Sequence, residues 1–280
     1  MSLSILNNIP SLAAQNQLAI TGSNLQKTLF RLSSGSRINS GADDAAGLAI
    51  ADGLHANVTA LTQSARNAND GIGLLQVGDG ALGQITALLN RAVTLATESA
   101  TDTVQGDGTA GDQRAALDDE YQKILEEIDN IGSATNYNGQ AVFGGSIATI
   151  YMSDGSGSTG EVKVDVSGAL AALDSGSLGL SSDLKSADDA QAELANINAA
   201  IGQVAGLRGT AGALINQLQA ATNVMNNQVQ NLSAAEDGIR AADMGQEVAN
   251  LTKFSILNQT GISALAQANQ MQQSVLSLLK

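Results

Sequence analysis

Apolar residues recur at alternating steps of three and four along two long stretches of the chain. The first stretch covers residues 54–96, and only Asp79 and Thr86 interrupt its apolar series. A shorter series over residues 117–131 keeps the same spacing. Such steps place the side chains along one face of an α-helix. The pattern therefore predicts a long helix followed by a shorter one.

The second long series covers residues 194–239 and also keeps strictly to steps of three and four. Its three interruptions, Arg208, Thr222 and Glu236, lie 14 residues apart. An average period of 3.5 residues is typical of helices that pack as left-handed coiled coils. A helix over this series would be about 70 Å long, which predicts a rod rather than an ordinary globular domain. The spacing is compatible with a rod within one chain and with a coil between chains.

Turn-forming residues separate these helices. The glycine- and aspartate-rich segment 106–112 predicts a break, with Asp112 as the N-cap of the next helix. We expect that helix to end near Gly132, before a turn at residues 136–139. The last long helix should begin near Asp183.

The segment between the second and third long helices alternates in polarity. Residues 147–152 and 162–166 each alternate, and the glycine- and serine-rich segment 154–160 lies between them. This arrangement predicts a β-hairpin with a short loop. A connector over residues 174–183 follows.

Both ends of the chain predict amphipathic helices with few charges. Residues 1–34 and 248–280 carry an apolar stripe opposite a face rich in Asn and Gln. Ordering such a segment alone costs conformational entropy with little to bury. We therefore expect the ends to fold only against each other or a neighbouring subunit. The residues expected to form this assembly core are Ile5, Leu18, Leu25, Leu29, Leu32, Leu251, Phe254, Leu257, Ile262, Leu265, Val275 and Leu278.

Composition narrows the chemistry that the chain can carry out. The 280 residues include no Cys, one Pro and one His, and only 2% are aromatic. Thiolate zinc sites, disulfides and thiol catalysis are excluded, and a histidine relay within one chain is excluded too. We expect no cofactor, no bound metal and no catalytic residues.

Charge is distributed unevenly. The net charge is −14, yet all 27 acidic residues lie in 43–247, while residues 1–42 and 248–280 carry only basic ones. This balance argues against a nucleic-acid partner. No uninterrupted apolar run approaches membrane-spanning length, so we expect no membrane association. The first ten residues do not resemble an ordinary secretory signal.

Several ordered motifs carry a resemblance to a known family. Residues 31–50, RLSSGSRINSGADDAAGLAI, resemble the amino-terminal signature of bacterial flagellins. Asn138–Gly139 is similar to the turn that precedes the β-hairpin in that family. The segment from ILNQTG at residues 256–261, through ALAQANQ at 264–270, to VLSLL at 275–279 resembles the carboxy-terminal signature.

The resemblance implies a mainly α fold: a long coiled-coil helical rod with a small β-hairpin region, plus paired terminal helices that form a filament core. The implied divisions are an amino-terminal core helix at 1–43, rod helices and hairpin at 44–183, a rod return helix at 184–240, and a carboxy-terminal core helix at 241–280. Only about residues 168–183 fill the place where many members carry outer domains, so this looks like a minimal form.

The resemblance also implies a route and partners. It implies a homo-oligomeric helical filament, secretion through the flagellar type III export apparatus, a secretion chaperone, cap and hook-associated proteins, and a place in the extracellular flagellum. Family members are recognised by a Toll-like receptor through the rod, and Arg91, Leu95 and Glu120 match that pattern. Val93 and Thr94 depart from it. We weigh an axial subunit contact ahead of receptor binding for this face.

Other candidate residues favour structural roles. His55 lies beside Leu54 on the apolar stripe and has no second His or Cys to complete a metal site. The carboxylates around Glu120 and Glu126 lack a calcium-loop pattern and predict a solvated helix face. Five glycines on the first long helix suggest close helix approach at subunit contacts. These are Gly71, Gly73, Gly78, Gly80 and Gly83.

Together these features predict a structural subunit that self-assembles into the bacterial flagellar filament and is not an enzyme. A hook–filament junction protein of the same family is the first alternative. A secreted adhesin on a helical scaffold is the second.

Overall fold

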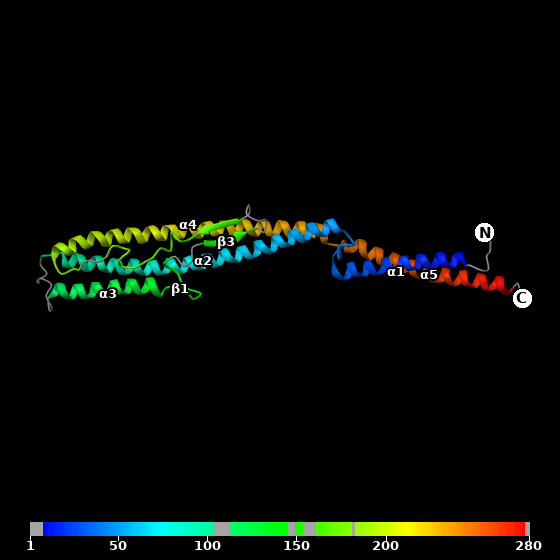
Figure 1. The fold of residues 1–280 in the computed structure, drawn as a ribbon, viewed down its shortest axis with the longest axis horizontal. Helices are drawn as coiled ribbons and strands as arrows, with labels where there is room; N and C mark the ends of the chain where they lie inside the picture. Colours follow the sequence, from blue (N-terminus) through cyan, green and yellow to red (C-terminus); the bar gives the residue numbers. More distant parts are fainter. Residues whose placement is uncertain (1–7, 103–111, 145–148, 154–160, 181–182, 278–280) are drawn as a thin grey trace. The chain divides into compact units, whose positions relative to one another are not determined.

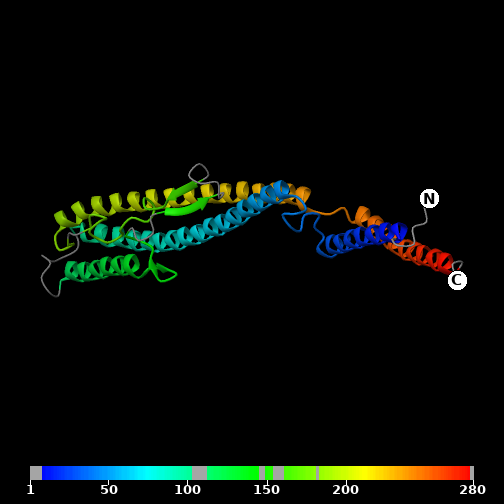
Figure 2. The same cartoon turned by 45° about the vertical axis from the view of Figure 1, so that its right-hand side comes forward.

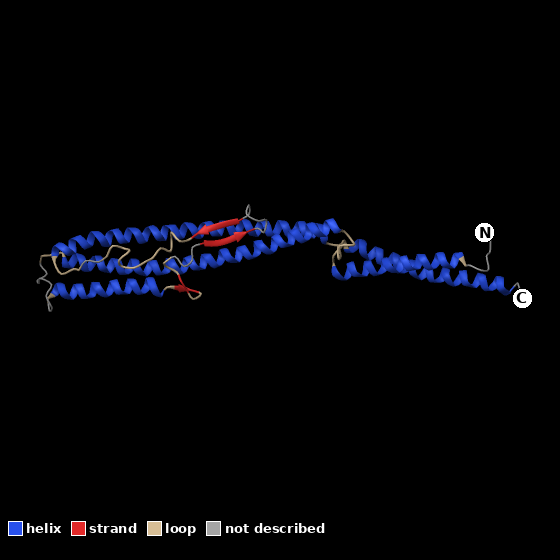
Figure 3. Cartoon of the chain, in the orientation of Figure 1, coloured by secondary structure: helices blue, strands red, loops and turns tan. Residues whose placement is uncertain are grey.

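A computed structural model describes residues 8–102, 112–144, 149–153, 161–180 and 183–277. Within them lie five helices and four short strands (Figure 1). The helices are α1 (Ile9–Ser34), α2 (Ala45–Ser99), α3 (Gln113–Ala134), α4 (Ala187–Arg240) and α5 (Met244–Ser277). The strands are β1 (Asn136–Tyr137), β2 (Gln140–Ala141), β3 (Thr149–Ser153) and β4 (Glu161–Asp165). The fold is mainly α with a small hairpin region, as predicted (Figure 3).

Contacts divide the chain into two compact units. The first comprises Met1–Ala56 and Asn231–Lys280, and the second comprises Asn57–Gln230. In the second unit α2, α3 and α4 run along one another, as both views show (Figures 1 and 2). The first unit holds α1 and α5.

The apolar stripes are the packed faces of the long helices. No stripe residue of α2 is exposed, and along α4 only Arg208 is. The interruptions are matched across the pair, because Arg208 Nε donates to Asp79 Oδ1 at 2.8 Å. Two breaks in two separate stripes thus form one exposed ion pair between α2 and α4.

A buried polar cluster fastens α3 to the start of α4. The phenol of Tyr121 donates to Glu193 Oε1 at 2.5 Å, and both side chains are fully buried. Asn196 donates to the other oxygen of Glu193 at 2.9 Å. On α3, Asp118 accepts a hydrogen bond from the backbone N–H of Leu184 at 2.9 Å. The connector is therefore tied to α3 before α4 begins.

The helix ends differ slightly from the prediction. Asp112 occupies the N-cap of α3, although its side chain makes no capping hydrogen bond. The last long helix begins at Ala187 rather than near Asp183, because the hydroxyl of Ser186 accepts from the backbone N–H of Asp189 and caps the helix there.

The expected turn at 136–139 is itself a small hairpin. β1 pairs with β2 in antiparallel register, Tyr137 opposite Gln140. Asn138 and Gly139 both have positive φ, 52° and 78°, as the two central positions of a type I′ turn require. The predicted larger hairpin is formed by β3 and β4, with Thr149 opposite Asp165. Its predicted loop and residues 147–148 lie outside the described residues.

Three of the five helix glycines contact this chain's own hairpins and connector. A Cβ at Gly71 would lie 2.1 Å from Ile150 Cδ1, and one at Gly78 would lie 2.9 Å from Leu170 Cδ2. At Gly73 it would lie 3.1 Å from the hydroxyl of Tyr137. Gly80 and Gly83 have nothing described within 4 Å of that position. Intrachain packing therefore accounts for the first three, and the hypothesis of a subunit contact remains for Gly80 and Gly83.

By length and composition alone, α2 contains a segment apolar enough to cross a membrane. Its apolar stripe, however, is packed within the second unit, as Leu75, Leu82 and Leu89 are fully buried. A packed core helix meets the same criterion.

Candidate assembly interface

α1 and α5 lie side by side as an antiparallel pair (Figure 1). On α1 the covered positions follow steps of three and four from Ser11 to Leu32, and on α5 they do so from Glu247 to Gln272. We call these two rows the terminal seam. Its members are Ser11, Ala14, Leu18, Thr21, Leu25, Thr28 and Leu32 on α1, and Glu247, Leu251, Phe254, Asn258, Gly261, Leu265, Ala268 and Gln272 on α5.

About half of the terminal seam is small or polar. Thr21 and Thr28 are 4% exposed, whereas the seam leucines of α1 are only half-buried. Gly261 receives Leu18, since a Cβ on the glycine would lie 2.9 Å from Leu18 Cδ1. A seam of this composition buries little apolar area, so it contributes little hydrophobic stabilisation by itself.

Many large apolar side chains of the pair lie outside the seam and are exposed. Phe30 is 66% exposed and Ile256 is 60% exposed. We call these residues the outer apolar set. Its members are Ile9, Leu12, Ile20, Leu29, Phe30, Met244, Val248, Ile256, Leu257, Ile262 and Met271. So many exposed large apolar side chains on one helix pair mark a surface that binds a partner.

The predicted assembly-core residues fall into three groups. Those in the terminal seam are Leu18, Leu25, Leu32, Leu251, Phe254 and Leu265. Those in the outer apolar set are Leu29, Leu257 and Ile262. Ile5 and Leu278 lie outside the described residues, and for Val275 only the helical backbone is described.

The sequence prediction missed most of the outer apolar set. Ile9, Ile20, Phe30 and Ile256 were not singled out, because they do not fall on the heptad row that the leucines define. The signal was present nonetheless, since these helices place large apolar residues on more than one face and carry almost no charge to solvate them.

A partly buried ion cluster lies at one end of the pair. Arg31 is 3.5 Å from Glu247 and 3.6 Å from Asp43. Glu247 Oε2 and Arg31 Nε are buried and have no hydrogen-bond partner among the described residues. The pKa of Asp43 is lowered from its ordinary value by the Ser40 hydroxyl and the backbone N–H of Asn39, so this carboxylate stays charged.

The two interhelix connections of this unit are bonded to each other. The backbone N–H of Arg37 donates to the carbonyl of Arg240 at 2.7 Å, and that of Ala242 donates to Gly35 at 2.9 Å. Gly35 has φ 70° and ends α1 in the left-handed region. The α1–α2 and α4–α5 turns are therefore held as one joint.

A second candidate face lies on the second unit. Arg91 and Glu120 form an exposed ion pair, with Nη2 2.7 Å from Oε1. Leu95, which was grouped with them, is 1% exposed. It belongs to the core rather than to this face, because its side chain points into the packed side of α2. Thr94 is exposed beside the pair.

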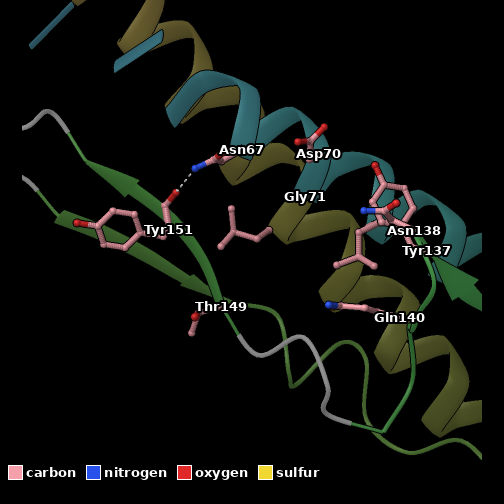
Figure 4. A pocket seen from close by; sticks show the side chains of 10 residues that line it. Asn67, Asp70, Gly71, Tyr137, Asn138, Gln140, Thr149 and Tyr151 are labelled. Atoms are coloured by element: carbon pink, nitrogen blue, oxygen red, sulfur yellow. Dashed lines mark hydrogen bonds between the residues drawn. The ribbon is translucent and has the colours of Figure 1, made fainter. Parts of the chain in front are cut away.

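An open groove lies between α2 and the two hairpins (Figure 4). Asn67 and Asp70 line it from α2, and Tyr137 and Gln140 line it from the small hairpin. Asn67 donates to the carbonyl of Tyr151 at 3.1 Å, which attaches β3 to the helix. The groove brings no nucleophile and base together.

Metal-binding and catalytic chemistry finds no support in the described part of the chain. No group of three or more His, Asp or Glu residues there could hold a metal ion. The single histidine, His55, lies 3.2 Å from Glu236, the last interruption of the α4 stripe. It therefore serves as a polar contact between α2 and α4.

The fold and the exposed apolar helix pair define a structural protein that associates with copies of itself. The sequence profile of the bacterial flagellin N-terminal helical region matches residues 5–148. The profile of the bacterial flagellin C-terminal helical region matches residues 194–279. The chain belongs to the bacterial flagellin family.

Full-length relatives agree with this assignment. A flagellin of Halalkalibacterium halodurans is 36% identical over 99% of each chain, and one of Bacillus subtilis is 33% identical over 99% of each chain. A crystal structure of Bacillus cereus flagellin is 31% identical and covers 61% of this chain and 94% of its own, with a TM-score of 0.47.

The protein is thus a structural subunit that self-assembles into the bacterial flagellar filament, and it is not an enzyme. Its homologues form the extracellular filament. Nothing in these matches favours the junction-protein or adhesin alternatives.

Proposed function

We propose that the outer apolar set forms the contacts between subunits at the core of the filament. The carrying observation is that the α1–α5 pair leaves eleven large apolar residues exposed, while more than half of the residues that face each other across the pair are small or polar. Each large aliphatic side chain that becomes fully buried contributes about 1.5–3 kcal/mol. A pair that leaves such residues exposed gains most of its stabilisation from neighbouring copies.

The functional divisions follow from this proposal. Residues 1–43 and 241–280 act as the core helices, and 44–183 with 184–240 act as the outer rod. All of the acidic residues except Asp43, Asp243 and Glu247 lie in these rod segments. A solvated, negatively charged exterior keeps subunits soluble before they assemble.

The proposal extends to the proteins that export and cap the filament. The chain passes unfolded through the flagellar type III export apparatus, is held by a secretion chaperone, and assembles with cap and hook-associated proteins outside the cell. The absence of Cys supports passage as an unfolded chain, because no disulfide can lock a folded state beforehand.

For the Arg91 and Glu120 face we favour an axial subunit contact over a Toll-like receptor. The two charges neutralise each other at 2.7 Å on an exposed surface. A receptor that reads either charge must first break this pair. An axial contact with a neighbouring subunit can leave the pair intact, because the two charges already compensate each other.

The proposal is tested by single substitutions on α5. Replacing Ile256 with Gln removes one member of the outer apolar set without touching the seam. Loss of about 1.5–3 kcal/mol per contact raises the critical concentration for polymerisation about 10- to 150-fold. Light scattering and negative-stain microscopy measure this change.

Gln259→Ser is the matched control, since Gln259 is an exposed polar residue on the same helix. We expect its critical concentration to stay within about twofold of the parent. Circular dichroism of each dilute subunit checks that helix content is unchanged. If Ile256→Gln polymerises at the parental concentration, the outer apolar set does not form the core contact.

A further inference from the structure

We propose that polar contacts between the two helices fix the register of α1 against α5, and that the partly buried Arg31–Glu247 pair serves this purpose rather than stability. The inference rests on the proposed function, because one alignment of the two helices is needed to present one arrangement of the outer apolar set. Three separate contacts along the pair carry it.

The first contact lies at the beginning of α1. Asn8 Nδ2 donates to Gln272 Oε1 at 2.6 Å and to the carbonyl of Ala268 at 3.4 Å. Ser11 Oγ donates to Asn269 Oδ1 at 3.2 Å. These side-chain contacts join residues about 260 positions apart in the chain. The hydrogen bond from Asn8 to Gln272 forms only in this alignment.

The second and third contacts lie farther along the seam. Leu18 fits against Gly261, which leaves room for it. At the other end Arg31 meets Glu247, the buried charged residue of α5. Glu247 Oε2 and Arg31 Nε find no partner among the described residues, so this ion pair does not recover its full desolvation cost.

A shift by one heptad would keep the seam pattern but break every one of these contacts. In one direction Leu18 would meet the bulk of Phe254 instead of Gly261. In the other direction Arg31 would face Phe254 and leave Glu247 unpaired. Apart from the backbone joint between Gly35 and Ala242, the apolar seam residues would tolerate such a shift, because leucines recur every seven residues on α1.

A register role and a stability role predict opposite outcomes for one variant. Arg31→Met with Glu247→Leu replaces the incomplete ion pair by apolar contact. Replacing a buried ion pair in this way is often neutral or stabilising. The variant should therefore melt no earlier than the parent, yet show a weaker preference for one alignment.

Disulfide trapping reads the register directly, because the chain has no Cys of its own. Ser11→Cys is combined with Asn269→Cys for the observed alignment, or with Ile262→Cys or Leu276→Cys for a shift of one heptad in either direction. Intramolecular products of the full-length chain are identified by non-reducing gels and peptide mass spectrometry. The same pairs are trapped in dilute subunits and in filaments.

We expect the parent to form the 11–269 product at least about tenfold more than either shifted product, a preference of about 1.4 kcal/mol. In the Arg31→Met, Glu247→Leu background this preference should weaken while the midpoint of thermal helix loss stays the same or rises. Asn8→Leu with Gln272→Leu should also weaken it. Lys27→Met with Gln246→Leu makes similar changes at exposed positions and should keep the parental preference.

Three results would overturn the proposal: a parent without any preference, an ion-pair variant that retains it in full, or a variant in which it weakens together with a lower melting midpoint. The last result would assign the ion pair an ordinary stabilising role. Failure of the register proposal is distinguishable from failure of the proposal that the outer apolar set forms the core contacts, because the Ile256→Gln polymerisation assay does not depend on the Arg31–Glu247 pair.

Discussion

Removing the hydroxyl of Tyr121 tests how the second unit is held together. Tyr121→Phe keeps the ring in the core but takes from Glu193 its 2.5 Å hydrogen-bond donor. Glu193 is fully buried, and among the described residues Asn196 would remain as its side-chain donor. A hydrogen bond to a charged group contributes about 1.5–3 kcal/mol, and its loss leaves a buried carboxylate oxygen unsatisfied.

For a unit of this size, each kcal/mol lowers the melting temperature by about 2–4 °C. We therefore expect Tyr121→Phe to melt about 3–12 °C below the parent in calorimetry of the dilute subunit. Tyr151→Phe is the matched control, since that side chain is 44% exposed and its change should stay within about 0.5 kcal/mol. Equal melting temperatures for parent and Tyr121→Phe would refute the view that this hydrogen bond anchors α3 to α4.

The remaining predictions concern alkali, glycine and salt. Burial, and after it the hydrogen bond to Glu193, raises the pKa of Tyr121. The protonated phenol therefore stabilises the fold below about pH 10, and this contribution is lost as the pH rises above that value. Denaturant titrations should show this alkaline loss of stability in the parent but not in Tyr121→Phe. Gly132→Ala should destabilise the second unit by about 1–3 kcal/mol, because its Cβ would clash with the Leu173 carbonyl. Gly80→Ala should stabilise the dilute subunit by up to about 1 kcal/mol. Slower polymerisation of Gly80→Ala would place Gly80 at a subunit contact. Added salt should promote polymerisation by screening the −14 charge, and a steady fall in turbidity with salt would contradict this.

Periodicity predicted the long helices well because it reports burial directly. Every stripe position of α2 is at least half-buried, since a 3.5-residue repeat leaves few other ways to cover those side chains. The pairing of Asp79 with Arg208 was not predicted. Each interruption was visible in its own stripe, but the register of α2 against α4 depends on the hairpin and connector between them.

The small hairpin was read only as a turn because it is too short to show alternation. β1 and β2 have two residues each, and their identity rests on Asn138 and Gly139 adopting positive φ. Local signals predict that turn. Whether the flanking residues pair depends on packing, here of Tyr137 beside Gly73 on α2.

The terminal helices show where sequence reasoning and structure part. The ends were expected to fold against each other or against a neighbouring subunit, and Leu18, Leu25 and Leu32 lie on the covered face of α1, which packs against this chain's own α5. A heptad pattern alone does not show whether its apolar face packs against the same chain or against another copy. Two helices that join first through a partly polar seam must bury their remaining apolar faces against something else. In a subunit built to polymerise, we therefore propose that less regular apolar residues, such as Ile20 and Ile256, form the contacts between copies.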